Sequence, residues 1–357
     1  MISVVIPFFR SGELLGEAIE SVFNQTEKDW ELILVDNNAS DETRLVAEKY
    51  LKKNPGRIRV VHEPRQGNAF ARNLGITCAQ GDFIAFLDDD DIMYPDRLKL
   101  QKSALKNESH ASLVYGIIDR VSQDNKKVLL SCVDFSPFKH FIECSSEVQK
   151  KIRLNFPDVP PSTFFFAKKI IQKTGSFDTH LTPFFLEDTD FCLSMYQNGD
   201  FIKIDEPIIR FRMPSSEFLI KKRKKTLNRY RIIKNQDYFF TKVIRLIQEK
   251  KLLEELEVQK ALSIWRARWL KEIGMSFLGV KNGVSFGRKL LLSSFKENPK
   301  DISVLRHFFR SFKSYEKRFL KYGDVQLLEE EVQKEIEFLM IENLFTGTHS
   351  CEFCGLN

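Results

Sequence analysis

The first hundred residues alternate between short apolar runs and stretches with apolar residues at helical spacing. The runs "ISVVIPF", "WELILVD", "RIRVVHE" and "DFIAFLD" are typical of buried strands. Between them, "ELLGEAIESVFNQ" and "GNAFARNLGITCAQG" predict helices, the latter ending at Gly81, and Asn38 or Ser40 can cap a further helix that stops near Gly56. Because a helix separates each strand from the next, the sequence predicts an α/β fold with a mostly parallel, Rossmann-like sheet flanked by helices.

The pattern changes twice further along the chain. After about residue 110, "ASLVYGIIDRV" and "KKVLLSCVDF" predict paired strands, and "STFFFAKKIIQKTGSFD" predicts a strand, a helix and a glycine stop. From about residue 214, long charged stretches such as "QLLEEEVQKEIEFLMIENLF" predict helices. We therefore expect two regions in the 357 residues, an α/β domain over 1–213 and an α-helical C-terminal region over 214–357.

Four consecutive aspartates, Asp88 to Asp91, follow the fourth apolar run directly. Adjacent like charges repel by about 1 kcal/mol per pair at 4 Å in water, so such a run is ordinarily a solvated loop or the first turn of a helix. In open α/β sheets, however, ligands bind beyond the carboxyl ends of the strands. A row of carboxylates at that place suits a hard divalent cation that carries substrate phosphates.

Several classes of protein are not expected from the sequence. No Gly-x-Gly-x-x-Gly follows the first strand and no Gly-Lys-Ser/Thr loop is present, which argues against a dinucleotide fold and a P-loop. Six scattered cysteines indicate reduced thiols rather than a disulfide framework. The pair Cys351 and Cys354 with His349 is a weak zinc signal that competes with two free thiols in a frayed tail.

The net charge of +6 is unevenly distributed, and its densest basic cluster is "IKKRKKTLNRYRIIK", residues 220–234. No nucleic-acid recognition motif accompanies this cluster, so we expect no nucleic-acid partner. Two interpretations stay open, a solvated helix face and contact with an anionic membrane surface. No apolar run approaches the roughly 20 residues that span a bilayer, and the start lacks a basic n-region and a cleavage site. We therefore expect a cytoplasmic protein, which the membrane interpretation would place on the inner face of the cell membrane.

Four stretches resemble, in order, the inverting GT-A-fold glycosyltransferase family of family 2 type, which uses nucleotide-diphosphate sugars. They are "SVVIPFFR", "SVFNQTEKDWELILVDNNASDET", "ARNLGITCAQGDFIAFLDDDDIMYPDRL" and "GSFDTHLTPFFLEDTDFCLSMYQNGDFIKIDEPIIRFR". Together they span roughly residues 3 to 212, the whole of the expected first domain. One such stretch is weak support for the resemblance, whereas the occurrence of all four in the same order is specific for the family.

The resemblance implies a metal site and a catalytic pair. Asp88 and Asp90 match the family's Asp-x-Asp motif, which holds Mn²⁺ or Mg²⁺ against the donor diphosphate. Asp188 takes the position of the catalytic base that accepts the proton of the attacking hydroxyl, and Glu187 orients the acceptor or shares the role. Asp89 and Asp91 order the site, bind ribose, or are acids at a helix start.

The resemblance also implies the nucleotide contacts. Phe9 packs against the base, with backbone contacts from Pro7 and Phe8, and Asp36 accepts hydrogen bonds from the base or ribose. Gly67, Arg72 and Asn73 border the diphosphate, where Arg72 is either a phosphate partner or the salt-bridge partner of the acidic cluster. The nucleotide-binding set is Pro7, Phe8, Phe9, Asp36, Gly67, Arg72, Asp88 and Asp89.

Three positions depart from the family pattern. Arg10 stands where the family usually has Asn, and Phe8 stands where Thr is common. Met213-Pro214 follows "RFR" where many relatives carry a His able to approach the metal. The first two departures bear on donor fit, and the third leaves that metal contact to water or another side chain.

We thus expect a metal-dependent inverting glycosyltransferase of hexosyltransferase type. It would move a sugar from a nucleotide-diphosphate donor, a UDP-sugar by preference, to a saccharide or lipid-linked acceptor in bacterial surface polysaccharide biosynthesis. A homo-oligomer through the C-terminal helices is a further expectation. Two alternatives are a non-catalytic GT-A-like scaffold at a membrane surface and a sugar nucleotidyltransferase, whose usual Gly- and Arg-rich first loop is missing here.

Overall fold

The computed structural model describes three main ranges of the chain. These are residues 1–132, 159–213 and 284–310, without residues 109, 123, 127, 183–185 and 301, and with single positions between 238 and 278. The chain divides into two compact units, Met1–Ala261 and Leu262–Asn357, which we describe separately. The expected boundary after residue 213 stays a prediction, because residues 214–237 lie outside the described part.

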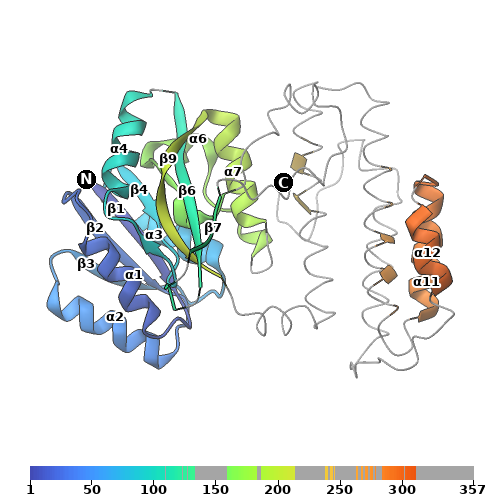
Figure 1. Ribbon diagram of the computed structural model, residues 1–357, viewed down its shortest axis with the longest axis horizontal. Coiled ribbons are helices and arrows are strands. Elements are labelled where there is room, and N and C mark those ends of the chain that lie inside the picture. Colours follow the sequence, from blue (N-terminus) through green and yellow to red (C-terminus); the bar gives the residue numbers. More distant parts are fainter. Residues whose placement is uncertain are drawn as a thin grey trace. The chain divides into compact units, whose positions relative to one another are not determined.

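One mixed sheet organises the first unit (Figure 1). Its strand order is β3-β2-β1-β4-β8-β6-β9-β5, with β7 paired to β6. The neighbours from β3 to β4 are parallel, as are β6 and β9, while β8 runs antiparallel to β4 and to β6. The strands are β1 (Ile2–Phe8), β2 (Trp30–Asp36), β3 (Ile58–His62), β4 (Phe83–Phe86), β5 (Ile92–Met93), β6 (Ala111–Val121), β7 (Val128–Cys132), β8 (Phe165–Ala167) and β9 (Asp200–Arg212).

Helices cover this sheet, so the α/β class expected from the sequence is confirmed. Helix α3 packs on β1 and β2, α2 on β3, α4 on β6, β8 and β9, and α7 on β6. The helices of this unit are α1 (Leu14–Phe23), α2 (Asp41–Lys53), α3 (Asn68–Cys78), α4 (Arg97–Asn107), α6 (Ile171–Thr174) and α7 (Glu187–Asn198). Short 3-10 helices lie at Pro161–Thr163, Lys168–Ile170 and Thr179–Leu181.

The predicted helix cap is confirmed, and one helix ends earlier in the sequence than predicted. Ser40 caps α2 by accepting a hydrogen bond from the backbone N–H of Thr43. Helix α3 ends at Cys78 rather than at Gly81, because the chain is already extended at Ala79. Gly81 instead meets the start of β1, where a Cβ would lie 2.7 Å from the carbonyl oxygen of Met1.

The parallel register brings the ends of distant strands to one edge. Phe8 pairs with Asp36 across β1 and β2, and Val5 pairs with Phe86 across β1 and β4. The residues that follow these strands therefore emerge side by side at the carboxyl edge, which is where α/β sheets bind ligands. Helix α3 sits tightly behind that edge, since a Cβ on Gly75 would lie 2.2 Å from the Cγ1 of Val5.

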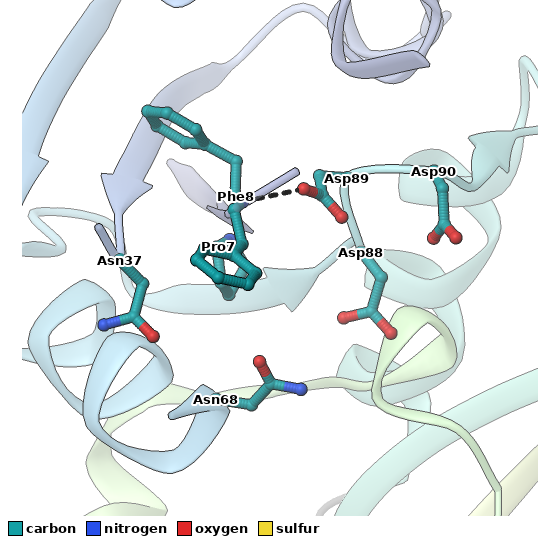
Figure 2. A pocket seen from close by; sticks show the side chains of 8 residues that line it. Pro7, Phe8, Asn37, Asn68, Asp88, Asp89 and Asp90 are labelled. Atoms are coloured by element: carbon teal, nitrogen blue, oxygen red, sulfur yellow. Dashed lines mark hydrogen bonds between the residues drawn. The ribbon is translucent and has the colours of Figure 1, made fainter. Parts of the chain in front are cut away.

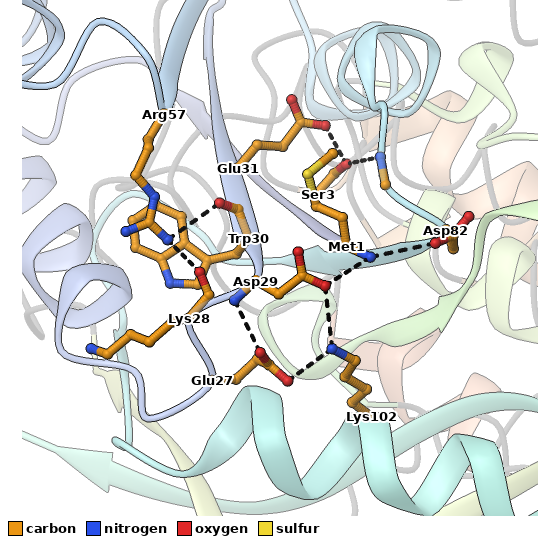
Figure 3. Close-up of polar contacts among 11 residues, drawn as sticks. Met1, Ser3, Glu27, Lys28, Asp29, Trp30, Glu31, Arg57, Asp82 and Lys102 are labelled. Atoms are coloured by element: carbon orange, nitrogen blue, oxygen red, sulfur yellow. Dashed lines mark hydrogen bonds and ion pairs between the residues drawn. The ribbon is translucent and has the colours of Figure 1, made fainter.

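The opposite, amino-terminal edge is held by ion pairs (Figure 3). The Met1 ammonium lies 3.0 Å from Oδ2 of Asp29, and Nζ of Lys102 lies 2.8 Å from Oε2 of Glu27 and 3.5 Å from the same Asp29 oxygen. Lys102 thus bridges two carboxylates on α4's side of the sheet, away from the carboxyl edge.

The described part of the second unit contains α11 (Val284–Glu297) and α12 (Ile302–Arg310). Leu278, Leu291 and Val304 form a small buried core there. Among the described residues, no helix combines the length and the apolar character that a bilayer-spanning segment needs. The basic cluster 220–234 and the pair Cys351 and Cys354 lie outside the described residues.

Candidate active site

An open pocket of about 490 Å³ lies at the carboxyl edge of β1, β2 and β4. Figure 2 shows three aspartates along one wall and Asn37 across from them. The first strand, the turn after β2, the start of α3 and the loop after β4 all contribute to it. Its lining residues are Pro7, Phe8, Phe9, Asn37, Asn68, Asp88, Asp89 and Asp90.

Two of the four consecutive aspartates hold the loop in place. Oδ2 of Asp89 accepts a hydrogen bond from the backbone N–H of Phe9 at 2.9 Å. Asp91 is buried and accepts from the hydroxyl of Ser162 at 2.5 Å and from the backbone N–H of Arg212 at 3.1 Å. The Ser162 hydroxyl in turn accepts from the backbone N–H of Asp88. Of the roles left open for Asp89 and Asp91, the structure favours ordering of the site.

Asp90 carries a carboxylate that the described part of the chain leaves without an ion pair. Burial, followed by repulsion from Asp88 and Asp89, raises the pKa of Asp90 to about 7. A buried carboxylate in this state is stabilised by any cation that reaches it. The Asp90 side chain lines the pocket, so the cation can arrive from there.

The donor set fits a cation that arrives together with phosphate oxygens. Within the described ranges, no group of three or more His, Cys, Asp or Glu side chains could hold a metal ion by itself. Asp88 and Asp90 supply carboxylate oxygens on one wall of the pocket. Mg²⁺-type ions are commonly held by one or two carboxylates plus substrate phosphates and water, and this set meets that requirement.

Arg72 joins the aspartate loop to a second carboxylate group. Its guanidinium is 3% exposed, and Nη2 donates to Oδ1 of Asp88 at 2.9 Å while Nη1 lies 3.7 Å from Oε1 of Glu187. The ring of Phe177 lies 5.5 Å from the guanidinium carbon. Sequence alone left Arg72 between a phosphate contact and a salt bridge, and the structure shows the salt bridge.

Glu187 and Asp188 begin helix α7, so both project at its amino-terminal end. The preceding residue, Leu186, is buried and has a φ of 79°, a left-handed backbone that a leucine seldom adopts. Burial and then repulsion from Asp188 raise the pKa of Glu187 to about 7, and burial also raises the pKa of Asp188. The two acids therefore share a site that resists a second negative charge.

Two further residues that were expected near the donor, Asp36 and Asn73, form hydrogen bonds within the protein. Asp36 is buried and accepts from the backbone N–H of Ala39 and from Nε of Arg44, both at 2.8 Å. Burial alone would raise its pKa, but these hydrogen bonds lower it. Asn73 holds the backbone of Phe177 through paired hydrogen bonds. A nucleotide contact of Asp36 stays a prediction.

Gly67 and Phe9 shape the two ends of the pocket region. Gly67 has a φ of 139°, and a Cβ there would lie 2.2 Å from the hydroxyl of Thr182, so no larger residue fits. Phe9 lines the pocket, and the guanidinium of Arg10 lies 4.6 Å from its ring centroid. The unusual Arg10 thus contacts the aromatic residue expected to face the base. Pro214, the other departure, lies outside the described residues.

Sequence reasoning missed three polar residues of the site. Asn37 donates to the carbonyl oxygens of Glu63 and Arg65 and accepts from the backbone N–H of Gly67. Asn68 lines the pocket at the start of α3, and Ser162 links two aspartates of the loop. Of these three residues, only Asn37 could have been predicted from the sequence, because it directly follows the second strand.

The comparisons with known proteins agree with this geometry. Residues 3–175 match the model of the family described as Glycosyl transferase family 2. These residues belong to glycosyltransferase family 2. The match includes the strands β1 to β8, the aspartate loop and Arg72, while β9 and the Glu187–Asp188 pair lie beyond it.

Curated relatives of this chain include glycosyltransferases from bacteria and archaea. An uncharacterized glycosyltransferase of Methanocaldococcus jannaschii is 29% identical over 238 residues, which is 66% of this chain and 78% of the relative. The UDP-Glc:alpha-D-GlcNAc-diphosphoundecaprenol beta-1,3-glucosyltransferase WfgD of Escherichia coli is 35% identical over 127 residues, 35% of this chain and 48% of the relative. Matches to two Rickettsia glycosyltransferases cover 16% of the length of those relatives.

A solved structure shares the fold. S. aureus TarS 1–349 in complex with UDP-GlcNAc aligns with a TM-score of 0.53 at 19% identity, covering 91% of this chain and 94% of that one. Together with the family match, this confirms the GT-A fold expected for the first domain.

Proposed function

We propose that this family 2 protein is a metal-dependent inverting glycosyltransferase that transfers a sugar from a UDP-sugar to a saccharide or lipid-linked acceptor. One observation carries the proposal. Two carboxylate groups from segments far apart in the sequence, Asp88–Asp90 and Glu187–Asp188, are joined through the buried Arg72 beside one pocket. A transferase of this type needs both, one group toward the leaving diphosphate and one toward the acceptor hydroxyl.

The residues of the chain divide the work between the two substrates. Pro7, Phe8 and Phe9 line the pocket together with Asn37 and would contact the nucleotide. Asp188 accepts the proton of the acceptor hydroxyl as that oxygen attacks the anomeric carbon, and a single base on the face opposite the leaving group leads to inversion. Its raised pKa suits a base at neutral pH.

Asp88 and Asp90 would hold Mn²⁺ or Mg²⁺, which as a Lewis acid supplies charge stabilisation to the leaving diphosphate. Asp89 and Asp91 keep their backbone anchors and so hold this loop in place for the cation. Arg72 orients Asp88 from below the pocket.

The choice of donor and acceptor is supported by relatives. TarS was solved with UDP-GlcNAc, and the E. coli relative is named for a UDP-Glc donor and a diphosphoundecaprenol-linked acceptor. We extend a UDP-sugar donor and a saccharide or lipid-linked acceptor of bacterial surface polysaccharide type to this chain. A homo-oligomer through the C-terminal helices is proposed from their helical pattern.

Two other readings have less support. A scaffold without catalysis does not need an unpaired carboxylate in the pocket, and Asp90 is one within the described residues. A sugar nucleotidyltransferase would use a Gly- and Arg-rich first loop, and the sequence after β1 is "FRSGELLG" instead.

The experiment is a panel of UDP-, GDP- and dTDP-sugars incubated with Mn²⁺ and mixed saccharide or polyprenyl-diphosphate-sugar acceptors. We expect release of nucleoside diphosphate and a new glycoside with one UDP-sugar, with inverted anomeric configuration by NMR. Release of a nucleoside triphosphate from pyrophosphate and a nucleotide sugar would instead show a nucleotidyltransferase. No turnover with any donor would support the scaffold.

The pH dependence of transfer follows from the carboxyl pair. Burial raises the pKa of Asp188, and burial with repulsion from Asp188 raises the pKa of Glu187 to about 7. Because only an ionised base accepts a proton, kcat should rise as the pH rises through the range in which this pair ionises. Glu187→Gln removes the neighbouring charge, so the acid limb should move to lower pH. Measurement of kcat from about pH 5 to about pH 9 at saturating donor and Mn²⁺ tests this, since saturating metal suppresses the titration of Asp90. An acid limb unchanged in Glu187→Gln would contradict it.

We also propose that the protein lies on the inner membrane surface, where a lipid-linked acceptor is found. The cluster 220–234 motivated this, and the described C-terminal helices support it. On α11, Lys289, Leu292 and Lys296 are exposed at helical spacing. On α12, Ile302 is 70% exposed and Phe309 is 63% exposed. Basic residues interleaved with exposed apolar ones suit an anionic interface.

Co-sedimentation with vesicles of rising anionic-lipid fraction measures this contact. Each basic residue near such a surface contributes about 1 kcal/mol, so binding should increase with anionic lipid and fall with salt. Replacement of all five basic residues of 221–225 by Gln should abolish binding, and replacement of Lys289 and Lys296 by Gln should weaken it less. Binding that does not depend on lipid charge or salt, or no binding by the parent protein, would contradict the proposal. The cluster 220–234 and the exposed residues of α11 and α12 would then be solvated helix faces.

A further inference from the structure

Lys242 reaches two carboxylates at the start of separate elements. Its Nζ lies 2.7 Å from Oδ1 of Asp190, in the first turn of α7, and 2.9 Å from Oδ2 of Asp178. Asp178 caps the 3-10 helix Thr179–Leu181 by accepting a hydrogen bond from the backbone N–H of His180. One lysine from a segment beyond the sheet therefore ties α7 to this 3-10 helix.

The neighbours of Lys242 anchor its segment within the first unit. Phe239 and Val243, within a helical turn on either side, are 2% and 1% exposed. The hydroxyl of Tyr238 donates to the same Asp178 oxygen at 2.9 Å. Two buried apolar side chains and two polar contacts thus anchor this segment, in which the Lys242 side chain itself is 34% exposed.

The two carboxylates depend on the lysine for compensation of their charge. Asp190 is buried, which raises its pKa, and Lys242 opposes that shift. Burial would also raise the pKa of Asp178, but the hydrogen bond and charge of Lys242 lower it to about 2. Without the ammonium group, the carboxylates of the buried Asp190 and of Asp178, whose side chain is 16% exposed, would repel each other and favour a separation of α7 from the 3-10 helix.

Both tied elements border the catalytic groups. Asp190 lies two residues after Asp188 in the same first turn of α7. The 3-10 helix leads to Thr182, which approaches Gly67 at the start of α3 too closely for a Cβ to fit between them. A shift of either element therefore changes the distance from the base to the pocket.

We propose that Lys242 is a positioning residue for the transfer step, acting through Asp190 to hold the start of α7, and with it Asp188, at its place beside the donor pocket. The proposal rests on the proposed function. It assigns a role in transfer to a residue outside the family match and beyond the sheet.

The test compares Lys242→Met and Lys242→Arg with the parent in the full-length protein. A misplacement of about 1 Å can cost on the order of 10²-fold in rate, so we expect Lys242→Met to lower kcat by about 10-fold or more. The Kd of UDP with Mn²⁺, measured by calorimetry, should stay within about twofold, because the pocket at β1 and β4 does not contact Lys242. Lys242→Arg keeps the charge and should recover most of kcat.

Lys102→Met is the matched control. Lys102 also bridges two carboxylates, Glu27 and Asp29, but at the opposite edge of the sheet (Figure 3). Its loss should lower thermal stability with kcat near the parental value. If Lys242→Met does not fold, Lys242→Gln, which keeps hydrogen-bond donors without the charge, takes its place with the same expected split between kcat and Kd.

Three results would overturn the proposal: parental kcat in a folded Lys242→Met or Lys242→Gln protein, a fall in UDP affinity that equals the fall in kcat, or no recovery in Lys242→Arg. Asp188→Asn separates this failure from that of the proposed function. If Asp188→Asn is inactive and the Lys242 variants are parental, only the positioning role is wrong. If Asp188→Asn transfers sugar at the parental rate, the proposed function is wrong in its assignment of Asp188 as the base.

Discussion

Asp188→Asn should lose transfer by on the order of 10²-fold or more while it keeps its affinity for the donor. The amide has nearly the same shape as the carboxylate but cannot accept the proton of the acceptor hydroxyl. Asp188 accepts a hydrogen bond from the backbone N–H of Thr189 at 2.8 Å, which the amide oxygen can also accept, so the helix start should remain intact. Initial rates of glycoside formation at saturating donor measure the loss.

The control for this variant is Asp205→Asn. Asp205 is 84% exposed and pairs with Lys203 on β9, so its replacement should leave kcat at the parental value. UDP–Mn²⁺ calorimetry should give the same Kd for Asp188→Asn as for the parent, because Asp188 is not among the residues that line the pocket. Transfer at a near-parental rate by a folded Asp188→Asn protein would remove Asp188 from the role of base.

The second large effect is expected from Asp90→Asn, which should lose the metal-dependent part of donor binding. Asp90 is a pocket carboxylate without an ion pair in the described part of the chain, and burial with repulsion from Asp88 and Asp89 raises its pKa to about 7. In the parent, Mn²⁺ should tighten UDP binding, and UDP with Mn²⁺ should raise the thermal midpoint. In Asp90→Asn both effects should be lost, with UDP affinity near that of the metal-free parent.

For the metal-free protein, we expect the same substitution to leave the thermal midpoint unchanged or to raise it. Replacement of a buried, repelled carboxylate by a neutral amide removes its unfavourable interactions with Asp88 and Asp89, so the thermal midpoint without metal should equal or exceed that of the parent. Asp96→Asn is the control, since Asp96 accepts from the Thr26 hydroxyl outside the pocket and should leave the Mn²⁺ effect intact. Parental UDP–Mn²⁺ affinity in Asp90→Asn would show that the metal assignment is wrong.

The sequence predicted most of the elements that form the site. The alternation of apolar runs with helical spacing was enough for β1 to β4 and their helices, because each local period matches the burial of its own element. The hairpin of β6 and β7 and the glycine stop after α6, at Gly175 with a φ of 72°, were also confirmed. The aspartate run was correctly placed at the end of a buried strand.

The direction of the later strands was decided by the tertiary structure. The first four strands are parallel as expected, but β8 inserts antiparallel between β4 and β6. A run such as "FFA" has the same apolar pattern in either direction, so its orientation depends on which neighbours complete its hydrogen bonds.

The residue types alone establish which chemistry is available at each position. They place carboxylates after the fourth strand, a second carboxylate pair 99 residues further on at Glu187, and a parallel sheet edge that presents the first group. Tertiary structure alone decided how these carboxylates are used. Asp89 and Asp91 are held by Phe9 and Ser162, while Asp90 has no ion pair within the described part. Four identical side chains in a row carry no local signal for that difference, because it arises from donors that the fold brings from distant segments.

The same reason applies to Arg72 and Lys242. Each pairs with carboxylates at least 16 residues away, at separations that no sequence period encodes. A buried cation takes the charge partners that the packed elements place within about 4 Å, and the strength of that pairing comes from its removal from water. The residue types can therefore be recognised in the sequence, but the ion pairs that position Asp188 and the aspartate loop exist only once the sheet, α3 and α7 have packed together.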